Sequence, residues 1–139
     1  MSSKAASTPG RKKASNIFKE AKSFSSFSVN DLKAAKDFYG EKLGLDISET
    51  EEALELRSGN NTIFLYPKPN HSPASFTVLN FPVDDIEEAV EELAAMGVKL
   101  EHYDLPDLKT DKRGIFTGQG HQIAWFKDPA GNILSVIEE

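Results

Sequence analysis

The stretch SFSVNDLKAAKDFYGEKLGL, residues 26–45, joins a strand pattern to an amphipathic helix pattern. From Phe24 onward, alternate residues separate into two different faces, which is typical of a strand. Apolar residues then recur every three or four positions, and Gly44 follows them, as expected where a helix ends. The stretch therefore predicts a strand and a helix, with Asn30 or Asp31 capping the helix.

The same plan occurs a second time in FPVDDIEEAVEELAAMGVKL, residues 81–100. Val83 stands 54 positions after Val29, and both valines begin a V-x-D-[LI] motif that precedes a helix of matched length. The glycines that end the two helices, Gly44 and Gly97, are one residue off this register. Any two strand–helix units share some of these features, but the matched motif favours an internal duplication.

Hairpin patterns complete each unit. In the first, two strand-like runs flank the turn residues GNN at 59–61. In the second, VKLEHYDL at 98–105 predicts a strand, and IAWF and NILSVI form the arms of a hairpin around the turn at 127–132. This turn contains DPAGN, in which proline fixes φ, glycine allows a positive φ and the Asp and Asn side chains cap the backbone.

Composition narrows the class of protein. The chain has 139 residues and no cysteine, which excludes disulfides, thiolate metal sites and a cysteine nucleophile. The net charge is −6, and since residues 1–15 hold four basic side chains and no acidic one, the remainder carries −10. Such an acidic body is a poor surface for nucleic acid. No apolar run is long enough to span a membrane, and no secretory signal is visible, so we expect a cytoplasmic protein.

The N-terminal residues 1–15 are rich in serine, alanine and lysine, with a Pro-Gly break. This composition predicts a disordered basic tail. A transit peptide is the alternative, but the segment contains one arginine and no clear apolar face. We therefore expect a single folded domain over residues 16–139.

The two repeated stretches, followed by AWFKDPAGNILSVIE at 124–138, resemble the vicinal oxygen chelate superfamily. That superfamily includes glyoxalase I, bleomycin-resistance proteins, fosfomycin-resistance enzymes and extradiol dioxygenases. The resemblance covers about residues 17–139 and rests on the V-x-D-L-x-x-A-x-x-F-Y start together with the D-P-x-G-N hairpin. It implies an α+β fold of two tandem βαβββ modules, about 17–75 and 76–139, with curled mixed sheets around a cavity, often in a homodimer.

Many members of this superfamily hold a divalent metal with His, Gln or Glu at three fixed places. The resemblance puts these places at Phe24, Val78 and Ser135. Phenylalanine and valine offer no oxygen or imidazole donor to a metal. We therefore expect no family-type metal site and no resident cofactor, unless displaced ligands hold a divalent ion elsewhere.

The three histidines are the residues that could rebuild such a site. His71 lies in a Pro-rich loop, His102 near a strand end and His121 just before a strand. None has a partner histidine or carboxylate two or four positions later on a shared face. We interpret them as surface or loop residues.

The resemblance also assigns a cavity wall, made of sheet-face residues from both modules. Its ligand-binding candidates are Phe24, Ser26, Ser28, Val78, Asn80, Ile123, Trp125, Ile133 and Ser135. This wall is aromatic and aliphatic with a few neutral hydrogen-bonding groups, as small-molecule sites usually are, and it offers no acid–base pair. Asp128 is interpreted as a turn residue, and Lys112 and Arg113 as part of a solvated loop.

Three functions are compatible with these features. The first is a metal-free protein that binds a small molecule, in the manner of drug-sequestering members. The second is a non-catalytic interaction module whose cavity is filled by its own side chains. The third is a metal-dependent lyase or dioxygenase with displaced ligands. We favour them in this order, with a homodimer and a small-molecule ligand as the expected partners.

Overall fold

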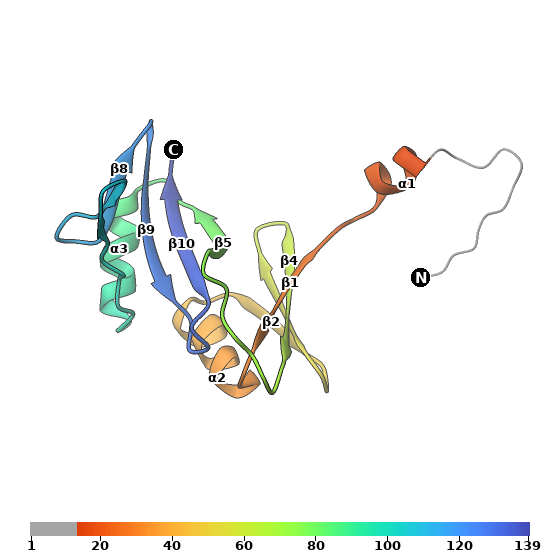
Figure 1. Ribbon diagram of the computed structural model, residues 1–139. Coiled ribbons are helices and arrows are strands. Elements are labelled where there is room, and N and C mark those ends of the chain that lie inside the picture. Colours follow the sequence, from red (N-terminus) through yellow and green to blue (C-terminus); the bar gives the residue numbers. More distant parts are fainter. Residues whose placement is uncertain (1–13) are drawn as a thin grey trace, which may run out of the picture.

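The computed structural model describes residues 14–139, which form two modules that repeat one topology (Figure 1). In the first module, strand β1 leads into a helix and then into a three-stranded meander. Its elements are β1 (Ser25–Val29), α2 (Leu32–Lys36), the π-helical turn η1 (Asp37–Lys42), β2 (Asp46–Glu49), β3 (Leu54–Ser58) and β4 (Asn61–Pro67). The sheet order is β1-β4-β3-β2, with β1 parallel to β4.

The second module has the same order of strands in its sheet. Its elements are β5 (Thr77–Pro82), α3 (Ile86–Ala95), β8 (Ile115–Gly118), β9 (His121–Lys127) and β10 (Ile133–Glu138). A small hairpin between α3 and β8 consists of two strands of two residues each, β6 (Asp104–Leu105) and β7 (Leu108–Lys109). The sheet order is β5-β10-β9-β8, with β5 parallel to β10. The predicted α+β fold of two βαβββ modules is therefore confirmed, and the two sheets remain separate.

The strand predicted at residues 98–105 is wrong. Leu100 forms only an isolated bridge with Phe126, and β6 has two residues. Val98 packs into the core, and the backbone N–H of Glu101 donates to the carbonyl of Trp125, so the segment is anchored without a continuous ladder. The corresponding strand of the module is β8, which pairs with β9 after the loop that was predicted to be solvated.

The repeated V-x-D motif is explained by helix capping. The carboxylate of Asp31 accepts hydrogen bonds from the backbone N–H groups two and three residues later, at 3.0 and 3.3 Å. Asp85 caps α3 in the same way, at 3.0 and 3.2 Å. Of the two candidate caps for the first helix, Asp31 and not Asn30 is the one used. An extended residue with an accepting side chain satisfies N–H groups that have no partner within the helix.

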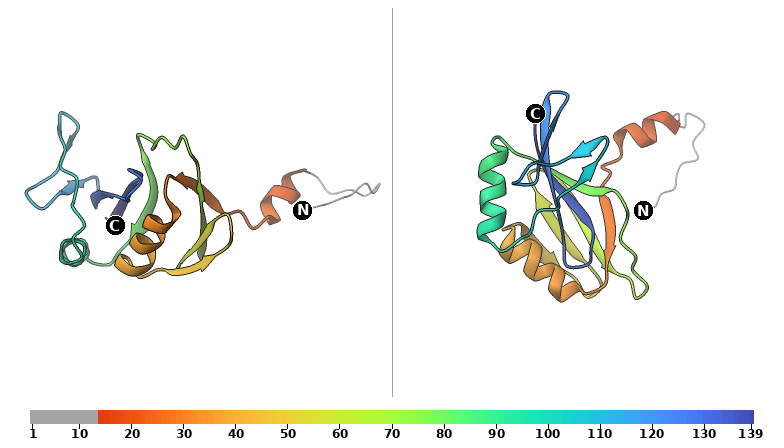
Figure 2. Two further views of the ribbon diagram at one scale, coloured as in Figure 1. Left: turned by 90° about the horizontal axis from the view of Figure 1, so that it is seen from below. Right: turned by 60° about the vertical axis from the view of Figure 1, so that its left-hand side comes forward.

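Both helices pack on the same side of the molecule, and the core lies between them and the sheets (Figure 2). The ring of Phe38 contacts Tyr39 and Phe126, with centroids 5.1 and 6.4 Å apart, so the core is continuous across the two modules. Strand residues alternate between this core and the opposite face, as β1 shows with Val29 buried and Ser26 exposed. The face of each sheet that points away from the core is therefore available for a binding site.

The chain before β1 forms a short helix, α1 (Ala14–Glu20), which projects away from the two modules (Figure 1). Ile17 and Phe18 on this helix are exposed. Residues 1–13, most of the tail predicted to be disordered, lie outside the described residues. Between residues 14 and 139, no helix is long and apolar enough to cross a membrane.

Candidate functional site

In the first module, the face of the sheet that points away from the helix carries serines and aromatic rings. Ser26 lies beside Phe64 on the neighbouring strand, and Ser28 lies beside Tyr66. The ring of Phe24 contacts that of Phe64, with centroids 4.9 Å apart. Phe24 remains 64% exposed, so the aromatic pair forms an outer rim of this face.

In the second module, Ser135 lies in register between Asn80 on β5 and Trp125 on β9. The hydroxyl of Ser135 is fully buried and donates a hydrogen bond to the side-chain oxygen of Asn80. This bond uses the hydroxyl hydrogen of Ser135, the residue that the superfamily resemblance placed at a metal-ligand position. The buried middle of β10 thus carries a neutral polar pair, Ser135 and Asn80.

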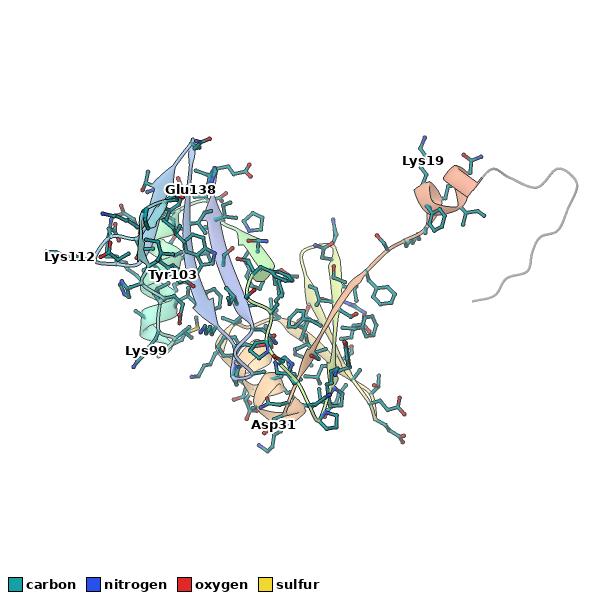
Figure 3. The ribbon with its side chains drawn as sticks, viewed as in Figure 1. Lys19, Asp31, Lys99, Tyr103, Lys112 and Glu138 are labelled. Carbon is teal, nitrogen blue, oxygen red and sulfur yellow. The ribbon has the colours of Figure 1, made fainter. Side chains whose placement is uncertain are left out.

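Trp125 sits in an aromatic cluster on the same face. Its indole N–H donates a 3.1 Å hydrogen bond to the hydroxyl of Thr77, which satisfies the polar edge of the ring. The rings of Tyr103 and Phe116 contact it, with centroids 5.5 and 6.2 Å away, and Tyr103 lies beside this sheet in Figure 3. Burial raises the pKa of Tyr103, and the charge of Glu101 raises it further, so its hydroxyl stays protonated at neutral pH.

A hollow of about 450 Å³ lies between the edge strands β1 and β5, where the two modules meet. Three of the predicted wall residues, Ser26, Ser28 and Val78, line it. Thr77 also lines it and connects it to Trp125. The remaining predicted wall residues lie outside this hollow: Phe24, Asn80, Ile123, Trp125, Ile133 and Ser135. The predicted wall is therefore divided between the hollow and the second sheet.

The lining of this hollow contains a histidine that the sequence did not single out as a site residue. The side-chain oxygen of Ser28 lies 2.7 Å from Nδ1 of His71. Nε2 of the same ring lies 3.0 Å from the carbonyl oxygen of Ala130. His71 lies in a loop, as predicted, but its two partners come from segments 43 and 59 residues away, and no local pattern reveals them.

The DPAGN turn holds this region together. One oxygen of Asp128 accepts from the backbone N–H groups of Ala130 and Asn132, both at 2.9 Å, which confirms its interpretation as a turn residue. The side-chain amide of Asn132 donates to the other oxygen of Asp128 and to the carbonyl of Ser28, both at 3.0 Å. The turn therefore fixes the position of β1 as well as its own shape.

The donor set does not fit a metal of the superfamily type. Two of the three expected ligand positions, Phe24 and Val78, carry hydrocarbon side chains, which leaves a single neutral hydroxyl at Ser135. Within residues 14–139, no group of three or more His, Cys, Asp or Glu side chains is placed to hold a metal ion.

A second, larger hollow of about 730 Å³ runs beside α3 on the helical side of the second module. Its rim includes Arg113, which lies 3.3 Å from a carboxylate oxygen of Glu87 and 3.5 Å from one of Asp111. These two carboxylates neutralise the positive charge of Arg113, so the rim of this hollow does not favour an anionic ligand. Lys112 points away from the protein into solvent (Figure 3), as expected for this loop.

Comparison with known proteins identifies the family. Residues 24–136 match the family model described as Glyoxalase/Bleomycin resistance protein/Dioxygenase superfamily. The chain belongs to this superfamily. The match spans both modules, in agreement with the repeated topology and with the motifs that suggested the resemblance. No sequence match was found among the curated proteins.

Similar solved structures confirm the fold of this superfamily member. A glyoxalase family protein from Enterococcus faecalis is 24% identical, with 88% of this chain and 99% of that chain covered and a TM-score of 0.64. A lactoylglutathione lyase from Agrobacterium tumefaciens is 22% identical (86% and 95% covered, TM-score 0.60). A bleomycin-binding protein in complex with bleomycin is 20% identical (86% and 98% covered, TM-score 0.62).

Proposed function

We propose that this superfamily member is a cytoplasmic homodimer that binds a small, largely uncharged molecule without a metal. The observation that carries this proposal is the hollow between β1 and β5. Among residues 14–139, its lining holds only one titratable group other than a tyrosine, His71. Apolar walls with a few neutral polar groups are typical of small-molecule sites. A metal-dependent lyase or dioxygenase is less well supported, because Phe24 and Val78 offer no ligands to a metal.

The second sheet extends this wall toward Trp125. The Trp125 indole is hydrogen-bonded to Thr77, which lines the hollow. A ligand that contacts Thr77 would therefore lie close to the tryptophan ring. A planar ligand can stack on the aromatic cluster, and the hydroxyls of Ser26 and Thr77 offer it hydrogen bonds. The solved structure of a similar bleomycin-binding protein in complex with bleomycin supports a small-molecule ligand here.

The proposed dimer rests on exposed aromatic side chains around the hollow. Phe24, Phe76 and Tyr66 are 64%, 67% and 42% exposed, and Phe76 and Tyr66 line the hollow itself. Apolar rings gathered on a surface usually mark an interaction site. A second copy that covers this rim would bury the rings and close the open side of the hollow. Sedimentation of wild type and of Phe76→Ser tests the dimer, with dissociation expected for the variant.

Fluorescence of Trp125 tests the binding function, because it is the only tryptophan in the chain. Small aromatic compounds, antibiotics and glutathione thioesters are titrated while emission is followed. We expect saturable quenching by one class, weakened in Ser26→Phe, which fills the hollow. Ser48→Phe is the matched control, since Ser48 is exposed at the far edge of the same sheet, outside the hollow.

Two results would count against this assignment. If calorimetry detects binding of a compound that leaves Trp125 emission unchanged, the ligand site lies elsewhere. If no compound binds and a structure of the dimer shows the hollow filled by side chains, the protein is an interaction module instead.

A further inference from the structure

The hydrogen bonds of His71 determine which of its ring nitrogens carries the proton. Nε2 faces the carbonyl oxygen of Ala130 at 3.0 Å, and a carbonyl oxygen can only accept. In the neutral ring, Nε2 therefore carries the proton and Nδ1 presents its lone pair. The hydroxyl of Ser28, 2.7 Å from Nδ1, is then the donor of that bond. A serine, a base and a group that orients the base lie in one line of hydrogen bonds.

The geometry points to a catalytic Ser28–His71 dyad that hydrolyses small neutral esters in the hollow between β1 and β5. Both side chains line this hollow, so the serine oxygen is on a surface that a substrate can reach. A hydroxyl nucleophile needs an adjacent base, and the base needs a partner that fixes its orientation. Here Nδ1 of His71 is the base, and the carbonyl of Ala130 provides the orientation.

Different segments hold each member of the dyad. Ser28 is fixed by pairing of β1 with β4, and its carbonyl accepts a bond from the Asn132 side chain at 3.0 Å. The backbone N–H of His71 donates to the carbonyl of Lys68 at 3.0 Å, which closes the loop that carries the ring. Ala130 belongs to the DPAGN turn, where its N–H is bonded to Asp128. Such independent support is what a catalytic geometry requires.

The lining indicates the class of substrate. Within the part of the chain that the structure describes, it contains no lysine, arginine, aspartate or glutamate, so a neutral molecule is favoured over a charged one. Val78, Ala74 and Phe76 provide apolar contacts for an acyl group, and the hydroxyls of Ser26 and Ser72 can donate to the acyl oxygen. Because a neutral carbonyl, not a carboxylate, faces Nε2, the imidazolium is stabilised less than in a triad. We therefore assign esters with good leaving groups, not amides.

The reaction balances with water as the second substrate. The Ser28 oxygen forms a bond to the ester carbonyl carbon while its proton passes to Nδ1 of His71. The bond from that carbon to the leaving oxygen then breaks, and the alcohol departs with the proton. A water molecule next attacks the acyl-serine, gives one proton to Nδ1 and releases the carboxylic acid, and Ser28 regains the proton.

A fluorophosphonate and p-nitrophenyl acetate test this dyad directly. Attack by the serine oxygen on phosphorus displaces fluoride, so one phosphonyl group is expected on Ser28 by peptide mass mapping. Ser28→Ala should abolish the label, and Ser28→Ala and His71→Asn should each lower ester hydrolysis at least about tenfold, since acid–base catalysis typically contributes 10²–10⁴-fold. Ser48→Ala and His102→Asn, both outside the hollow, should retain label and rate.

An unlabelled wild-type protein, or a label that maps to another residue, would overturn the assignment. The mapping uses the wild-type chain, so its result holds even if a variant fails to fold, which circular dichroism reports. The inference rests on the proposed function only in that both place a ligand in the same hollow. Quenching of Trp125 without labelling of Ser28 would contradict the catalytic dyad and support the binding function. Labelling of Ser28 without quenching of Trp125 would support the dyad and contradict the proposed binding function.

Discussion

The hydroxyl of Tyr39, in η1 of the first module, donates a 2.7 Å hydrogen bond to the carboxylate of Asp128, in the closing turn of the second module. Tyr39 is fully buried and Asp128 is 5% exposed, so this bond joins the modules inside the core. Burial raises the pKa of Tyr39, and the negative charge of Asp128 raises it further. The phenol therefore remains a donor throughout the neutral and moderately alkaline range.

Replacing Tyr39 with phenylalanine tests this link. The buried carboxylate of Asp128 loses one partner while the ring still fills the core, so we expect the free energy of unfolding to fall by about 1.5–3 kcal/mol, the usual range for a hydrogen bond to a charged group. Tyr66→Phe is the control, because that ring is 42% exposed, and it should stay within about 0.5 kcal/mol of wild type. Equal stability of the two variants in urea titrations would show that the Tyr39 bond contributes nothing.

The helix caps give a second prediction. Asp31→Ala and Asp85→Ala each remove a carboxylate that accepts two backbone N–H groups, so each should lower the free energy of unfolding by about 1 kcal/mol. Asp84→Ala provides the matched control, since Asp84 precedes the same helix but is not its cap. Chemical denaturation measures all three. If Asp84→Ala lowers the free energy of unfolding as much as Asp85→Ala does, the stabilisation comes from negative charge near the helix and not from the cap.

These caps belong to the part of the fold that local sequence reveals. A V-x-D motif before an apolar 3.6-residue period defines a strand end, a cap and a helix within about ten residues, and its recurrence reveals the duplication. The alternation on β1 also separates Val29, which faces the core, from Ser26, which does not. Local chemistry determined these features, so a single sequence was sufficient to predict them.

The site depended on contacts that local patterns do not contain. His71 meets Ser28 and Ala130 because a Pro-rich loop returns to β1 beside the closing turn, and sequence spacing gives no sign of this. The strand predicted at 98–105 failed for a related reason. Its apolar residues, Val98 and Leu100, alternate as in a strand, but they pack into the core beside α3. The strand that pairs with β9 at this edge of the sheet is β8.

Asp111 gives a prediction for the dependence of stability on pH. Partial burial raises the pKa of this carboxyl, but backbone N–H groups of Ile115 and Arg113, at 2.9 and 2.8 Å, and the Arg113 charge outweigh it and lower the pKa below 3.8. The folded state thus favours the charged form. Its contribution to stability is present above the ordinary pKa and is lost as the pH falls through the lowered value.

Urea unfolding of Asp111→Asn against wild type at several pH values measures this contribution. We expect wild type to be the more stable at pH 5 to 7, with the difference shrinking below pH 3.8. Asp107→Asn changes the same charge at an exposed position of the preceding loop and should have little effect. A difference that grows toward acid pH would contradict the sign of the shift.

The metal-free proposal makes a prediction for chelators. A metal held by protein ligands contributes its binding free energy to folding, so its removal lowers the melting temperature. With hydrocarbon side chains at Phe24 and Val78, we expect the melting temperature to be unchanged in excess EDTA. EDTA preloaded with Ca²⁺ is the control for ionic effects.

A fall in the melting temperature of more than about 4 °C in EDTA alone, roughly 1 kcal/mol for a domain of this size, would mean that displaced ligands hold a metal. Metal analysis of protein purified without a histidine tag would then identify the ion, and the metal-dependent lyase or dioxygenase would become the favoured function.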